Sequence, residues 1–183
     1  MSSSRKKVIL RRNRPSGQAD ILAGYLPLSG FVRNRSLDLL DLAGRVLPIA
    51  LNDIKLISYI RDFNLNDTVN PERLTRRTFL ARPRTEGLWL RLTFTSGEIL
   101  EGLAPTDISL LDDLVNDAGL FLTPPDIRSN TQRIFVPRTS IADLTLIAVI
   151  TSPSKKKPDS PNPESSLQQA LFNADLPPNA RPN

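Results

Sequence analysis

Cysteine and histidine are both absent from this chain of 183 residues, and Met1 is its only methionine. Without cysteine there is no disulfide and no thiolate nucleophile. Without histidine there is no triad with a histidine base, no histidine-ligated haem and no zinc site of the Cys/His kind. Carboxylate or lysine catalysis stays open. The loss of so many reaction classes nevertheless predicts a protein that is not an enzyme and holds no cofactor or metal.

Long hydrophobic runs are absent as well. The chain has no apolar run of the roughly 18 residues that a membrane-spanning helix needs, and its polar start leads into only three apolar residues, Val8–Leu10. A secretory signal requires a longer apolar core. We therefore expect a cytoplasmic protein that does not enter a membrane.

Charge is distributed unevenly around a net value of +5. Residues 1–35 carry many basic side chains but only one acidic residue, Asp20, and residues 72–91 add a group of arginines. Residues 92–126 contain acidic side chains and neither lysine nor arginine. A basic face would attract phosphate-bearing partners, whereas scattered ion pairs would serve only solubility.

Short apolar segments dominate the pattern. Residues 88–94 alternate between apolar and other side chains, Ser96-Gly97 supplies a turn, and a second apolar segment begins at Ile99. This period of two predicts a β-hairpin. Similar segments recur along the chain, separated by glycine, proline, asparagine or aspartate, which indicates an all-β protein.

An internal repeat organises these segments. Residues 21–27 match residues 99–105 at an isoleucine, a leucine, a glycine and a proline, and the apolar segments that follow come in the same order. Duplication explains this match. We predict a first β unit at 1–64, a basic linker at 65–86, a second β unit at 87–151 and a disordered proline-rich tail at 152–183.

Each copy resembles the Sm/LSm/Hfq-like small β barrel. The second copy has an alternating strand, the Ser96-Gly97 turn and a strand centred on Gly102, and its segment Ile134–Arg138 followed by Ile141 is similar to the second motif of that family. A glycine at this place fits a sharply curved strand, where a Cβ would crowd the opposite strand. The resemblance implies two related five-stranded Sm-like small β-barrel units in tandem, all-β, with a disordered C-terminal tail.

The same resemblance implies a nucleic-acid binder, because Sm-like proteins often bind single-stranded RNA around a ring of subunits. The base-binding loop of the family is missing after Gly102, and Pro137-Arg138-Thr139 replaces its Arg-Gly loop. The fold is thus better supported than the function. Our first hypothesis is RNA or single-stranded DNA binding by the basic segments and one stacking ring. The residues concerned are Arg5, Lys6, Lys7, Arg11, Arg12, Arg14, Arg73, Arg76, Arg77, Phe79, Arg82 and Arg84.

Two alternatives stay open. The spacing of Arg73 and Arg77, with Asp107 and Ser109 downstream, resembles PilZ domains, which implies a cyclic di-GMP-responsive adaptor that binds the ligand through these four residues. The other alternative is a structural protein that oligomerises through exposed strand edges.

The tail contains a separate short pattern. Gln168, Leu171 and Phe172 form a Gln-x-x-Leu-Phe sequence that resembles the peptides by which bacterial proteins dock on the replication sliding clamp. Two adjacent apolar anchors on a flexible tether suit a partner's hydrophobic groove. We therefore predict a protein partner for this segment, with the sliding clamp as one candidate.

Overall fold

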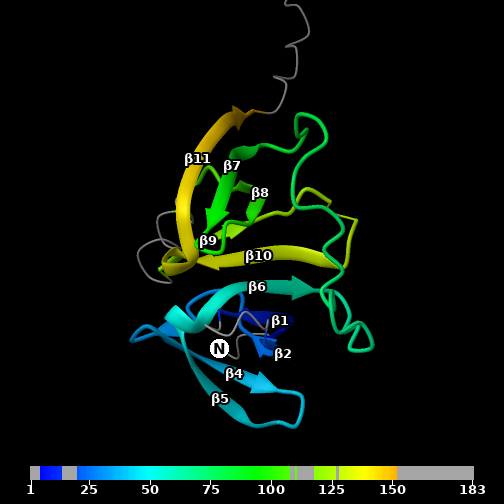
Figure 1. Cartoon of the computed structure of the whole chain (residues 1–183), viewed down its shortest axis with the longest axis vertical. Coiled ribbons are helices and arrows are strands. Elements are labelled where there is room, and N and C mark those ends of the chain that lie inside the picture. The colour runs from blue at the N-terminus through cyan, green and yellow to red at the C-terminus, as the bar shows by residue number, and fades with distance from the viewer. Residues whose placement is uncertain (1–4, 14–19, 108–109, 111–117, 127, 152–183) are drawn as a thin grey trace, which may run out of the picture. The chain divides into compact units, whose positions relative to one another are not determined.

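A computed structural model describes residues 5–13, 20–107, 110, 118–126 and 128–151 (Figure 1). These residues form an all-β structure, as predicted. Its strands are β1 (Lys6–Arg12), β2 (Asp20–Leu26), β3 (Val32–Arg33), β4 (Ser36–Asp41), β5 (Val46–Ala50), β6 (Ile54–Ile60), β7 (Gly87–Phe94), β8 (Ile99–Ala104), β9 (Gly119–Leu122), β10 (Thr131–Pro137) and β11 (Ile141–Ile150). Two 3-10 turns, η1 (Leu51–Asp53) and η2 (Arg138–Ser140), precede β6 and β11.

The strands form two open sheets. One sheet runs in the order β3-β4-β2-β1-β6-β10-β9, with β5 paired to β4, and the other runs β11-β7-β8. The predicted five-stranded β-barrel units are therefore not closed into barrels in these sheets. Strand β6 joins the two halves, because β1 occupies one of its edges and β10 satisfies the backbone donors and acceptors of the other. In Figure 1, β6 and β10 lie side by side between the two halves.

The two halves nevertheless share one strand order. The first half reads β6-β1-β2-β4-β5. The second reads β11-β7-β8-β9-β10, in which β8 meets the end of β9 through a bridge between Leu103 and Thr123. The sequence match between residues 21–27 and 99–105 thus falls on corresponding strands, β2 and β8.

The correspondence extends to local backbone geometry. The residues directly before the corresponding strands β4 and β9 have an unusual positive φ, 59° at Arg35 and 51° at Ala118. The carbonyl of each accepts a 2.9 Å hydrogen bond from the first residue of the following 3-10 turn, Leu51 in one half and Arg138 in the other. A non-glycine residue in this region of φ is uncommon, so its recurrence supports a duplicated backbone.

The repeated glycines sit where no side chain fits. A Cβ added to Gly24 on β2 would clash with the carbonyl oxygen of Leu40, and one added to Gly102 on β8 would lie 2.8 Å from the Cβ of Leu122. Leu40 lies on β4 and Leu122 on β9, which are the corresponding strands of the two halves. The close approach of strands expected from the sequence is therefore present in both halves.

Two apolar cores share the strands at the junction. Successive side chains of a strand point to opposite faces, so Phe135 of β10 and Phe121 of β9 belong to the first core while their neighbours belong to the second. Conversely, Leu56 of β6, a strand of the first half, belongs to the second core. Phe31 meets the rings of Phe121 and Phe135 edge-on, with centroids 6.0 and 5.1 Å away. Aromatic side chains of the second half thus complete the core of the first.

Candidate functional site

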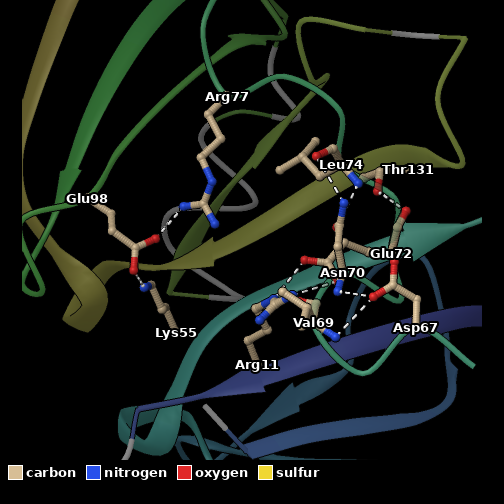
Figure 2. A network of polar contacts seen from close by, with 10 residues as sticks. All are labelled: Arg11, Lys55, Asp67, Val69, Asn70, Glu72, Leu74, Arg77, Glu98 and Thr131. Carbon is tan, nitrogen blue, oxygen red and sulfur yellow. Dashed lines mark hydrogen bonds and ion pairs between the residues drawn. The ribbon is translucent and has the colours of Figure 1, made fainter. Parts of the chain in front are cut away.

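The segment between β6 and β7 is fastened to both halves by polar contacts (Figure 2). Arg11 of β1 donates two hydrogen bonds to the Glu72 carboxylate, at 2.7 and 2.9 Å, and a third to the Val69 carbonyl at 2.6 Å. The side chains of Arg11 and Glu72 are 13% and 2% exposed. Thr131 of β10 donates to the Glu72 carbonyl at 2.8 Å. Residues predicted as a linker are therefore an anchored part of the structure.

Short side chains shape the same segment. Asp67 accepts hydrogen bonds from the backbone N–H groups of Val69 and Asn70, at 3.0 and 2.8 Å. Asn70 in turn accepts one from the N–H of Leu74 at 3.0 Å. Asparagine and aspartate commonly close turns in this way, and here they present Glu72 to Arg11.

Two glutamates before and within β8 hold the next part of the segment. Glu98 pairs with Lys55 and Arg77, as Figure 2 shows. Partial burial raises the pKa of Glu98, but hydrogen bonds from Lys55 and Arg77 outweigh it, so its pKa lies below the ordinary value. These contacts tie β6 and the segment to the end of the β7–β8 hairpin.

The Glu101 side chain is buried, and both of its carboxylate oxygens accept hydrogen bonds. It accepts hydrogen bonds from the Phe79 N–H at 2.9 Å, the Trp89 indole at 3.2 Å and the Arg91 guanidinium at 2.7 and 2.9 Å. Burial raises its pKa, but these donors together lower it below the ordinary value. The ring of Phe79 packs edge-on against Trp89 with a centroid distance of 5.6 Å. Glu101 therefore acts as a structural acceptor.

Six of the twelve residues predicted to contact nucleic acid instead contact other side chains of the same chain. Ion pairs or hydrogen bonds join Lys7 to Asp62, Arg11 to Glu72, Arg12 to Asp20 and Asp53, Arg73 to Asn64 and Arg77 to Glu98. Phe79 is half-buried against Trp89. Charge counted along the sequence could not reveal these partners, because they are distant in the chain.

The remaining predicted contacts are exposed. All five side chains that the structure describes face solvent, namely Arg5, Lys6, Arg76, Arg82 and Arg84. A hydrogen bond from Thr75 lowers the pKa of Asp126, and the nearby charge of Arg76 lowers it further. Arg14 lies outside the described residues. The basic surface of the described chain is thus smaller than the sequence suggested.

The structure does not bring the described residues of the PilZ-like pattern together. Arg77 contacts Glu98, immediately before β8, whereas Asp107 follows the other end of that strand. About 16 Å of strand separates the two ends, at ~3.3 Å per residue. Arg73 is held by Asn64 at 2.9 Å, and Ser109 lies outside the described residues. The tail residues Gln168, Leu171 and Phe172 also lie outside them, and their partner stays a prediction.

The first half contains a basic hollow that was not predicted from the sequence. A hollow of about 210 Å³ opens beside the start of β1 and the β3–β4 hairpin. Its lining is Arg5, Pro27, Gly30, Phe31, Arg33, Ser36 and Asp38. The signal in the sequence is Arg33-Asn34-Arg35, a basic pair around a turn-forming asparagine.

Strands β5 and β11 each have an open edge in the described residues. Strand β5 pairs only with β4, and β11 pairs only with β7. Apolar side chains on these strands are exposed, namely Val46 (56%), Leu144 (48%), Leu146 (54%) and Val149 (52%). A hollow of about 460 Å³ adjoins β11 and is lined by Gly119, Leu120, Arg138, Ile141, Ala142, Asp143 and Leu144. Open edges with apolar side chains are suited to pair with another strand.

The described part of the chain contains no cluster of three or more aspartate and glutamate side chains placed to hold a metal ion. It contains no helix with the length and apolarity needed to cross a membrane.

Comparison with known proteins gives one match. The model of a family of unknown function, DUF6982, matches residues 4–148. Neither the curated proteins nor the solved structures include a match to this chain. The match spans most of the sequence and includes all eleven strands, except for the end of β11. The protein therefore belongs to the DUF6982 family.

Proposed function

We propose that this protein is a self-associating structural protein whose chains join edge to edge, β11 of one chain pairing with β5 of the next. One contrast carries the proposal. Strands β6 and β11 are the last strands of the two halves, yet β6 is almost wholly buried while β11 is exposed along most of its length. The difference between them is that β6 has a second neighbour, β10.

The internal junction supplies a template for the missing neighbour. Strand β10 ends at η2 as β5 ends at η1, so Pro137 corresponds to Ala50 and Phe135 to Pro48. Phe135 pairs with Ile57 of β6 and fills the first core. By the same register, Pro48 of a second chain would pair with Leu144 of β11.

The two surfaces match in chemistry as well as position. The outward side chains of β5 are Val46, Pro48 and Ala50, all exposed and all apolar. They would meet Leu144, Leu146 and the 460 Å³ hollow beside β11. Burying half-exposed side chains of this kind contributes about 1 kcal/mol each, and the strand pairing adds backbone hydrogen bonds.

Proline at position 48 moderates the affinity. Pro48 has no N–H, so it cannot donate a hydrogen bond to the new ladder. Association also costs several kcal/mol in lost translational and rotational freedom. We therefore expect a reversible association with a Kd of about micromolar. Because the two edges differ, the contact is head-to-tail and gives rings or open chains.

Sedimentation of the full chain over a range of concentrations tests this function. The wild-type chain should form oligomers, and Val46→Lys or Leu146→Lys should leave monomers, because a lysine on an edge strand opposes pairing. Leu80→Lys is the matched control, since Leu80 is 78% exposed and lies in the segment between β6 and β7.

A mixing experiment tests the direction of the contact. Each single variant keeps one open edge, so an equal mixture of Val46→Lys and Leu146→Lys chains should give a dimer of one chain of each kind and nothing larger. A wild-type chain that stays monomeric at every concentration, or a Leu80→Lys variant that loses association equally, would refute the proposal.

A further inference from the structure

We propose that the hollow between the start of β1 and the β3–β4 hairpin binds a phosphodiester group of single-stranded nucleic acid. Two guanidinium groups line it, those of Arg5 and Arg33. Both side chains are exposed, and neither makes an ion pair within the described residues. They are therefore available to a ligand, unlike Arg11, Arg12 and Arg77.

The charge of the lining suits a singly charged phosphate. Asp38 is the one carboxylate among the lining residues, so two guanidinium groups and one carboxylate leave a net charge of +1. Each phosphodiester of a nucleic-acid strand carries one negative charge, whereas a phosphate monoester carries about 1.5 to 2 at neutral pH. Charge complementarity thus favours the diester. Guanidinium groups can also hold two phosphate oxygens at once.

The second half of the chain provides an internal comparison. Its corresponding hollow, of about 280 Å³, lies at the start of β7, the end of β8 and β9, with Pro105 in the place of Pro27. Its charged lining residues are Glu86 and Arg133, which leave no net charge. Arg133 lies over the Phe121 ring, 3.8 Å from its centroid. The hollow is therefore basic in the first half but not in the second.

The hairpin that carries Arg33 keeps further positive charge at the rim. Asn34 and Arg35 form its two-residue turn, with φ values of 51° and 59°. Such a turn favours Asn-Gly, yet an exposed arginine occupies the second position. Lys6, beside Arg5, is also exposed. Arg35 and Lys6 lie where they can meet neighbouring phosphates of a strand bound in the hollow.

Fluorescence anisotropy with a labelled single-stranded uridine oligomer tests the site on the full chain. A Leu146→Lys background separates binding from the proposed self-association. Arg5→Gln and Arg33→Gln should each weaken binding about fivefold, as expected for one exposed charge contact. Each should also reduce the slope of log K against log salt by about 0.7. Arg128→Gln removes the same charge from an exposed residue that does not line the hollow and should leave affinity within about twofold.

Competitors define the ligand. An unlabelled oligomer should displace the labelled one. Inorganic phosphate at the same phosphate concentration should not displace it, because free phosphate, like a monoester, carries more negative charge than a diester and has no neighbouring phosphates. The proposal is overturned if the oligomer does not bind, if Arg5→Gln and Arg33→Gln bind it as tightly as the parent, or if the Arg128→Gln control loses as much affinity as they do. Binding to phosphatidylglycerol vesicles without binding to the oligomer would also overturn the nucleic-acid assignment. Retained melting temperatures in the variants confirm that the fold is intact.

Discussion

Removing the Glu72 carboxylate should destabilise the protein strongly, since it leaves the Arg11 guanidinium buried without its counter-ion. Glu72 is 2% exposed and Arg11 13% exposed, and the loss of one partner from such a pair costs about 3 to 5 kcal/mol. Arg11 would keep its hydrogen bond to the Val69 carbonyl and some contact with water. We therefore expect Glu72→Gln to lower the free energy of unfolding by about 3 kcal/mol, at the lower end of that range.

A double-mutant cycle separates the ion pair from the volume of the side chains. Replacing both partners with apolar residues of similar size, Arg11→Met with Glu72→Leu, removes both buried charges at once. Such replacements are often neutral, so the double variant should be within about 1 kcal/mol of wild type. The two single changes should then be coupled by about 2 kcal/mol or more.

Urea unfolding measured by tryptophan fluorescence is the assay, because Trp89 is the only tryptophan in the chain. Asp62→Asn provides a control for a solvent-exposed pair. The Lys7–Asp62 side chains are 38% and 83% exposed, and water screens a pair of that kind, so its removal should change stability little. If Glu72→Gln lowered the free energy of unfolding by less than about 1 kcal/mol, the Arg11–Glu72 pair would not behave as a buried ion pair. Arg11 would then count again as a residue that can contact a ligand.

Three further predictions follow from the same contacts. The lowered pKa values of Glu98 and Glu101 mean that their contribution to stability is present above the ordinary value of 4.5 and is lost as pH falls through the folded-state pKa. The free energy of unfolding, measured from neutral to acidic pH, should therefore decrease once the pH is below about 4.5. The decrease should be less steep in Glu101→Gln than in wild type. Phe135→Ala should cost about 3 to 5 kcal/mol in urea unfolding, because it empties the first core at the junction. Arg35→Gly should raise stability by about 0.5 to 1 kcal/mol, since glycine relieves the positive φ, and a measured loss would contradict the turn geometry.

Local features of the fold were predictable from the sequence. The alternation over residues 88–94 and the Ser96-Gly97 turn depend on neighbours in the chain, and the β7–β8 hairpin follows from them. The recurrence of Gly24 and Gly102 marked corresponding strands, because a position without room for a Cβ accepts only glycine. These signals act over a few residues, and a duplicated sequence repeats them.

Tertiary structure alone decided how the strands and charges found their partners. Backbone donors and acceptors are identical in every strand, so nothing local indicates that β6 pairs with β10 rather than closing a barrel within its own unit. Arg11 and Glu72 are 61 residues apart, and only folding turns an expected nucleic-acid contact into a buried ion pair. The same folding left Arg5 and Arg33 exposed around one hollow. Proximity in space, which decides whether a charge is neutralised or available, is a property of the whole packed chain.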